Sequence, residues 1–257
     1  MKRIFSIGLV VITSSVFANE NVVPEKSSGV YCGFECGASI STDILFAPDW
    51  NLMGVTKHSW EPVHSDSFET NFGTHKCLGA KIGYQFNPTI GIEAAYNYRG
   101  KFNSIRGYAP TTDALHGEIF SINCISFQTV MFNLNLLPEV SWGGFVPYVT
   151  SGIGVAINKT GELRNYDVFN QSVPISFDTR LRGKTCKSFA WQAGVGVHYT
   201  FFQKWRFELG YRYVDVGKLM TSDSFVGVIS GYTSTVLPFV AKHPAFNEIM
   251  ASLVYCF

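Results

Sequence analysis

The stretch LGAKIGYQFNPTIGIEAAYNYR, residues 78–99, decides the fold. Every second residue from Leu78 to Phe86, and again from Ile90 to Tyr98, is apolar or aromatic. A period of two places these side chains on one face of an extended strand. The connection Asn87-Pro88-Thr89 is short and has the composition of a turn. The stretch therefore predicts two antiparallel strands joined as a hairpin.

The opposite face of this hairpin combines small residues with charges. It contains glycines at 79, 83 and 91 together with Lys81 and Glu93. A soluble sandwich would present larger polar residues to water, whereas small residues with a few charges suit the interior of a narrow barrel. The apolar face must then point outward, and lipid is the surrounding that makes this tolerable.

The same pattern, in places weaker, recurs along the chain and predicts eight strands of about 10 residues, the length that crosses an apolar band of about 25 Å. The expected strands are Val30–Ser41, Leu78–Phe86, Ile90–Tyr98, Phe120–Leu136, Phe145–Ala156, Trp191–Phe201, Phe207–Tyr213 and Ile249–Phe257.

The connections between these strands alternate in length. Three are short (residues 87–89, 137–144 and 202–204), and four are long (about 42–75, 100–117, 161–187 and 221–247). Short turns at one end and long loops at the other are typical of membrane barrels. The sequence predicts an all-β fold, an eight-stranded antiparallel up-and-down transmembrane β-barrel with four long outer loops. Aromatic residues beside the short turns indicate an interfacial girdle: Tyr84, Phe86, Tyr199, Phe201, Trp205, Phe207, Tyr255 and Phe257.

Three strands carry a resemblance to a known family. They read Ile249-x-Ala251-x-Leu253-x-Tyr255-x-Phe257, Pro147-Tyr148-Val149-x-x-Gly152-x-Gly154 and Phe207-Glu208-Leu209-Gly210-Tyr211-Arg212-Tyr213. They resemble the eight-stranded outer-membrane barrels of the OmpA, OmpX and opacity-protein type. The resemblance implies a bacterial outer-membrane location and contact with outer-membrane lipid. It also implies that Leu253, Tyr255 and Phe257 form the signal read by the barrel-assembly machinery. We expect no peptidoglycan-binding domain.

The first 18 residues have the form of a cleaved signal peptide. Met1-Lys2-Arg3 precedes an apolar run from Ile4 to Val11, and Val16 and Ala18 occupy the −3 and −1 positions of a cleavage site. The run is too short for a membrane anchor, which needs about 18–20 apolar residues. We expect residues 1–18 to be removed and residues 19–257 to form the barrel domain.

Charged residues on the inward phase predict an ion network inside the barrel. Its members are Lys81, Glu93, Arg99, Glu208, Arg212 and Glu248. The three-residue turn sets Lys81 opposite Ala95 and diagonal to Glu93, within reach of a long side chain. The alternative is a set of solvated charges near the barrel ends.

The six cysteines (Cys32, Cys36, Cys77, Cys124, Cys186 and Cys256) are too scattered for a zinc site. Export to an oxidising compartment leaves disulfides within or between chains open. We expect no metal and no cofactor. The net charge is only +1, so we expect no nucleic acid partner either.

The architecture favours a structural and surface-interaction, adhesin-like role, in which the outer loops bind a host-surface or envelope protein. A small channel is the alternative, although eight strands leave an interior only wide enough for side chains. A lipid-A-modifying enzyme is a further alternative. His116 with Glu118 would lie at the outer rim without a serine partner, and His198 is expected to be a lumenal histidine. We therefore expect no catalytic residues and no enzymatic activity.

Overall fold

The computed structural model describes residues 28–48, 68–102, 105–110, 116–122, 124–169, 173–202, 204–227, 233–235 and 238–257. The expected signal peptide lies outside these residues. Among the described residues, no helix has the length and the apolar character needed to cross a membrane.

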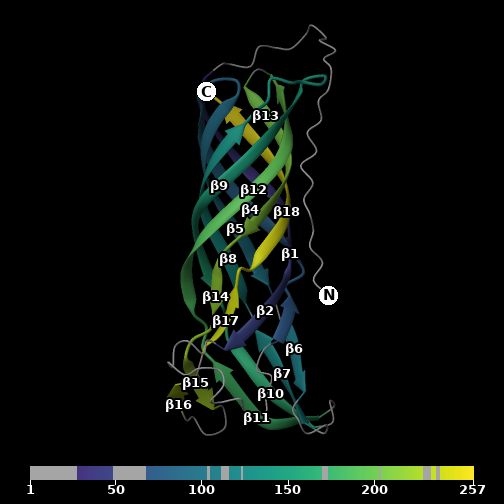
Figure 1. Ribbon diagram of the computed structural model, residues 1–257, viewed down its shortest axis with the longest axis vertical. Helices are drawn as coiled ribbons and strands as arrows, with labels where there is room; N and C mark the ends of the chain where they lie inside the picture. Colours follow the sequence, from purple (N-terminus) through teal and green to yellow (C-terminus); the bar gives the residue numbers. More distant parts are fainter. Residues whose placement is uncertain are drawn as a thin grey trace.

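Eight antiparallel strands close into a barrel in the order β1-β18-β13-β12-β9-β8-β5-β4 (Figure 1). The barrel strands are β1 (Gly29–Ser41), β4 (Thr74–Gln85), β5 (Ile90–Phe102), β8 (Ile125–Leu136), β9 (Phe145–Lys159), β12 (Thr185–Phe201), β13 (Trp205–Asp215) and β18 (Ala245–Cys256). The first and last strands complete the wall, since β1 pairs with β18 from Tyr31 opposite Cys256 to Ser41 opposite Phe246. The expected fold is confirmed.

Side chains alternate across the barrel wall with the predicted facing. On β4, Ile82 is 57% exposed on the outer face, whereas the neighbouring Lys81 is 8% exposed in the lumen. The hairpin register is also as predicted, because Lys81 pairs with Ala95 and Gly83 with Glu93. Phe34 and Phe132, at 78% and 67%, are the most exposed aromatic residues on the barrel strands themselves. The apolar face of the wall therefore points outward all around the barrel.

The three short connections lie together at what we term the turn end. In the first, the Asn87 side-chain oxygen accepts hydrogen bonds from the backbone amides of Thr89 and Ile90, both at 2.8 Å. Aromatic rings meet on the outer face here, as in the 5.1 Å contact between Trp205 and Tyr255 and that between Tyr84 and Phe86. This grouping fits the predicted interfacial girdle.

The four long connections gather at the opposite end, the loop end, and here the prediction was incomplete. They are not simple loops, because their described residues form ten further strands in two sheets (Figure 1). A four-stranded sheet has the order β14 (Lys218–Met220), β17 (Phe239–Lys242), β2 (Asp43–Pro48) and β3 (Phe68–Asn71). A six-stranded sheet has the order β16 (Thr233–Thr235), β15 (Ser224–Gly227), β11 (Val173–Leu181), β10 (Leu163–Phe169), β7 (His116–Ile122) and β6 (Ile105–Pro110).

Two expected strand limits were wrong. The segment 120–136 is not one strand, because it divides into the end of β7 and all of β8 near Cys124, whose φ of +57° breaks the extended backbone. The barrel strands are also longer than about 10 residues, with β12 reaching 17. They are longer because they continue past the outward apolar band into the loop end.

The lumen at the loop end is filled by a buried apolar cluster, which we term the plug. Its rings pack closely: Phe127 lies 4.9 Å from Phe246 and 5.5 Å from Phe102, between ring centroids. The members are Ile44, Phe46, Phe72, Phe102, Ile122, Ile125, Phe127, Met131, Ala156, Leu163, Leu181, Ala190, Val214, Val216, Leu219, Ala241 and Phe246. The plug joins barrel strands to both loop-end sheets.

Two tyrosines explain part of the glycine content of the lumenal face. Tyr148 on β9 lies across Gly196 on the neighbouring β12 and Gly210 on the next strand, β13, where an added Cβ atom would approach its hydroxyl to 2.6 and 2.7 Å. Tyr31 covers Gly83 in the same way. Each ring occupies the space that a side chain would need, so these glycines are required by close approach.

Candidate functional site

The lumen between the plug and the turn end holds eight buried charged side chains in two groups. The turn-side cluster consists of Lys81, Glu93, Arg206 and Glu208, and the loop-side cluster of Glu35, Arg99, Arg212 and Glu248. Each cluster has two bases and two acids, so its formal charges balance. Balance matters because an unpaired charge in such an interior is strongly unfavourable.

The turn-side cluster is built around the ammonium group of Lys81. It pairs with Glu208 and lies 3.5 Å from Glu93 Oε2. Glu208 also pairs with Arg206, whose Nε lies 2.8 Å from Oε1. The guanidinium of Arg206 lies over the ring of Tyr31, 4.7 Å from its centroid.

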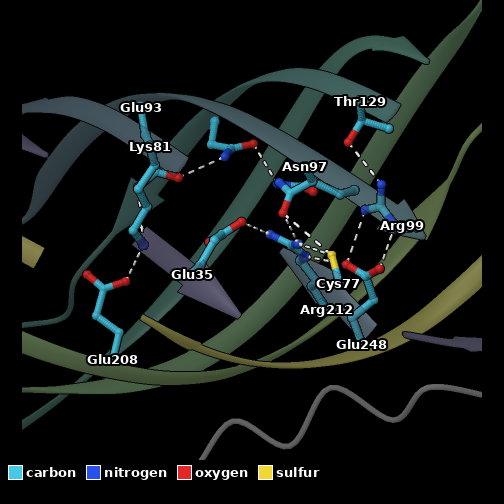
Figure 2. A network of polar contacts seen from close by, with 12 residues as sticks. Glu35, Cys77, Lys81, Glu93, Asn97, Arg99, Thr129, Glu208, Arg212 and Glu248 are labelled. Carbon is cyan, nitrogen blue, oxygen red and sulfur yellow. Dashed lines mark hydrogen bonds and ion pairs between the residues drawn. The ribbon is translucent and has the colours of Figure 1, made fainter. Parts of the chain in front are cut away.

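The loop-side cluster is built around the carboxylate of Glu248. Arg99 donates two hydrogen bonds to it, of 2.6 and 3.1 Å, and Arg212 Nε donates one of 2.7 Å. Arg212 also donates to Glu35 at 3.0 Å and to Asn97 at 2.9 Å (Figure 2). The two-pronged geometry of Arg99 on one carboxylate is the strong form of this contact.

Neutral side chains extend the turn-side cluster. Asn133 donates to Glu93 at 2.9 Å and accepts from Gln192 at 2.7 Å. A cavity of about 50 Å³, lined by residues of both clusters, leaves room for only a few water molecules. The lumen is therefore packed with polar side chains between the plug and the turn end.

The structure places all six predicted network residues in the lumen, but it divides them between two clusters. It brings Lys81 to Glu93 and Glu208, and Arg99 and Arg212 to Glu248. Sequence reasoning missed Glu35 and Arg206. Arg206 shares the inward phase of Glu208 and Arg212, so the period alone could have found it. Glu35 lies on a strand with weaker alternation.

Of the expected assembly signal, Leu253 and Tyr255 lie on β18, the strand that closes the barrel, and Phe257 follows it directly. Leu253 and Phe257 are exposed on the outer face, and the Phe257 amide donates to the Val30 carbonyl at 3.0 Å. Recognition of Leu253, Tyr255 and Phe257 by the assembly machinery stays a prediction.

The cysteines and histidines take different positions. All six cysteines are free thiols, with Cys77 buried in the lumen and Cys36 exposed on the outer face. His198 is buried in the lumen, with its ring stacked 6.3 Å from that of Tyr148, as expected of a lumenal histidine. His116 and Glu118 lie on β7 in the six-stranded sheet. Their side chains are outside the described part, and no cluster of metal-ligating residues occurs among the residues that the structure describes.

The four-stranded sheet is anchored to the barrel by buried polar side chains. Asn158 donates hydrogen bonds of 2.8 Å to the carbonyls of Val216 and Lys218. The Thr160 hydroxyl lies 3.0 Å from the Lys184 carbonyl and 2.9 Å from the Met220 carbonyl, and it accepts a hydrogen bond from the Lys184 amide. These contacts fix the connection from β13 to β18 against the end of β9.

The chain matches a known family over most of its length. Residues 9–236 match the family model described as outer membrane protein beta-barrel domain. The chain is 27% identical to the outer membrane protein PagN of Salmonella typhimurium (strain LT2), over 264 aligned residues that cover all of both chains.

Solved structures similar to this chain include Neisserial surface protein A, at 11% identity and a TM-score of 0.46, covering 90% of this chain and 100% of that one. They also include the outer membrane protease OmpT of Escherichia coli, at 10% identity and a TM-score of 0.48, covering 89% and 97%. The chain belongs to the outer-membrane β-barrel domain family and is a protein of the bacterial outer membrane.

Proposed function

We propose that this protein is an adhesin-like surface-interaction protein whose loop-end sheets bind a host-surface molecule or an envelope protein. The observation that carries the proposal is the regular structure of the loop end, where the long connections form two sheets over a plugged barrel. Binding residues are commonly held on connections that a rigid scaffold positions. The anchors at Asn158 and Thr160 supply such rigidity.

The filled lumen favours this role over that of a small channel. A solute passing along the axis would meet the turn-side cluster, the loop-side cluster and the plug in succession. The cavity of about 50 Å³ is far below the size of a passage for solutes. Planar-bilayer recordings of the folded protein should show no steady conductance, and a stable open state would favour the channel.

The proposal requires the loop end to face outward. Protease added to whole cells should then cut within residues 49–66 or 223–243, and the turns near Pro88 and Glu139 should stay intact. Cleavage confined to those turns would show that the orientation is the opposite one, with the loop-end sheets in the periplasm.

Excision of one hairpin tests the binding role directly. Asn165 pairs with Thr179, so residues 166–178 can be replaced by an Asn-Gly turn while Leu163 and Leu181 remain in the plug. Bacteria displaying this variant should adhere less to cultured epithelial cells than bacteria with the intact protein. An epitope inserted after Glu139, at the turn end, is the matched control and should leave adherence unchanged.

The result is interpretable only if the variant still forms a barrel. Heat-modifiable migration in gels reports an intact barrel, and antibody labelling of intact cells reports surface display. Unchanged adherence by an assembled, displayed variant would contradict a role for the β10–β11 hairpin. The same excision of β6 and β7 then extends the test to the rest of the six-stranded sheet.

A further inference from the structure

Lysines mark the edge of the outward apolar band at the loop end. On β4 the outward position beyond Leu78 is Lys76, and on β12 the one beyond Phe189 is Lys187. On β9 the last residue, Lys159, follows the outward Ile157, and on β5 Lys101 turns outward after the register shift that follows Arg99. All four side chains are exposed. We term Lys76, Lys101, Lys159 and Lys187 the lysine belt.

The lysine belt covers one continuous side of the barrel. Lys76 and Lys101 lie on the paired strands β4 and β5, next to the last paired residues Cys77 and Arg99. Lys159 and Lys187 are diagonal neighbours, because Lys187 pairs with Ile157 and Lys159 with Thr185. Strand β8 lies between these two pairs. The belt thus spans the consecutive strands β4, β5, β8, β9 and β12.

No carboxylate offsets these charges on the same strands. The five strands of this side contain a single acid, Glu93, and it is buried in the lumen. Among the described residues, no ion pair involves a belt lysine. The three turns at the opposite end contain only Glu139 and Lys204 as charged residues. The positive charge is therefore concentrated at one of the two membrane interfaces.

This placement fits the chemistry of an anionic lipid surface. A lysine at the edge of an apolar band can lay its methylene stem along the band and extend its ammonium group to the headgroups. Basic residues close to a membrane surface attract anionic lipids, and each lysine contributes appreciably. The apolar band adjoins the belt on its turn-end side. A lipid whose chains cover Leu78 or Phe189 therefore brings its headgroup to Lys76 or Lys187.

We propose that the lysine belt binds the anionic phosphate headgroups of the lipid leaflet at the loop end, and that it thereby orders a shell of such lipids along one side of the barrel. The inference does not rest on partner binding by the loop-end sheets. It would hold for a barrel without any protein partner.

Quenching of tryptophan fluorescence by brominated lipids tests the proposal. Trp191 lies two outward positions from Lys187 on β12 and is 40% exposed, whereas Trp205 lies at the turn end. Two variants that each keep one of these tryptophans, with the other four replaced by Phe, report on the two interfaces separately. The probes are phosphatidylcholine vesicles that contain a minor fraction of brominated phosphatidic acid or of brominated phosphatidylcholine.

We expect brominated phosphatidic acid to quench Trp191 as if it were enriched roughly fivefold over brominated phosphatidylcholine beside this residue. This ratio is the preference that about one lysine supplies near a membrane surface. The preference should fall toward one in the variant with Lys→Gln at all four belt positions, and it should fall in 0.5 M salt. The quadruple Lys→Arg variant keeps the charge and should keep the preference. Trp205 should show a ratio near one throughout.

The matched control removes charge elsewhere, with Lys204→Gln and Lys242→Gln together compared with Lys76→Gln and Lys101→Gln together. The control pair should leave the Trp191 ratio unchanged, and the belt pair should lower it. Equal ratios at Trp191 and Trp205, or a preference that survives the quadruple Lys→Gln change, would overturn the proposal.

Discussion

The barrel consists of two parts whose polarity is reversed. Between the turn end and the loop-side cluster, the lumen contains ion pairs and the outer face is apolar. Beyond that cluster, the lumen contains the plug, and the apolar band of the outer face ends at the lysine belt. The change occurs within single strands: on β18 the inward Glu248 and Phe246 belong to different parts, and Arg99 lies over the ring of Phe246 at 5.8 Å.

The comparison teaches that the surroundings of the wall determine what its interior must contain. Where lipid covers the outer face, exposed apolar side chains do not destabilise the protein. The narrow lumen is then filled with polar groups that pair their charges and hydrogen bonds with one another. Where water covers the outer face, the wall needs a buried apolar core, as in a soluble protein. The register shift after Arg99 on β5 helps this reversal, because it turns Lys101 outward and Phe102 inward.

The largest expected effect comes from breaking the loop-side cluster. Glu248→Ala leaves the guanidinium groups of Arg99 and Arg212 without their shared carboxylate, and this should destabilise the barrel by about 3–5 kcal/mol. Urea unfolding in lipid vesicles measures the loss. Glu162→Ala is the control, since its pairs with Arg164 and Arg180 are more than 30% exposed and should be worth less than about 1 kcal/mol. Similar losses for the two variants would show that the lumenal charges are solvated.

Two phenylalanines of β8 compare the plug with the lipid face. Phe127 is fully buried in the plug, and Phe132 is 67% exposed on the outer face. Phe127→Ala creates a cavity and should cost about 3–5 kcal/mol. Phe132→Ala should cost clearly less in the same unfolding measurement, because lipid chains fill the vacated space. A larger loss for Phe132 would contradict the division into two parts.

Arginine on the outer face tests the lipid-covered part of the barrel from outside. Ala94 and Val195 face outward in the lipid-covered part, as the alternation predicted. Ala94→Arg and Val195→Arg should each destabilise the barrel by about 2–4 kcal/mol if they lie near mid-membrane. Leu45→Arg is the control, since Leu45 is 52% exposed on β2 in the water-covered part and should tolerate the charge. Wild-type stability of both barrel variants in bilayers would refute the facing of the wall.

The smallest effect concerns the partners of Lys81. Double-mutant cycles should give a larger coupling energy for Lys81 with Glu208 than with Glu93, because the ammonium lies 3.5 Å from Glu93 and closer to Glu208. Coupled pairs typically give about 0.5–3 kcal/mol. A coupling energy of zero for Lys81 with Glu93 would contradict the pairing that the hairpin register predicts. The hydrogen bonds of Glu93 with Tyr31 and Asn133 would then be its stabilising contacts.

The alternation of the sequence was sufficient to predict the wall of the barrel and most of its buried charges. It works where one side of a strand faces lipid, since a period of two then separates Ile82 from Lys81 without ambiguity. It missed Glu35 because Tyr31 places an aromatic ring on the lumenal side of β1 and Cys36 lies on the outer side. These residues weaken the contrast between the faces.

The loop-end sheets were beyond this reasoning for a different reason. Strand β2 pairs with β17, which lies almost 200 positions later in the chain, and such pairing leaves no local period. The plug likewise collects residues such as Ile44, Leu163 and Leu219 from separate connections. Each of them alone is an ordinary apolar residue in a connection.

The fit of Tyr148 over Gly196 and Gly210 has a consequence for how the barrel can diverge. Any side chain at either glycine collides with the ring, and a smaller residue at 148 leaves a void inside the wall. A single substitution at any of the three positions is therefore disfavoured, although a paired exchange of a large and a small residue restores the packing. The three positions should vary together during evolution, so a library that randomises them jointly should recover combinations that one-at-a-time mutagenesis rejects.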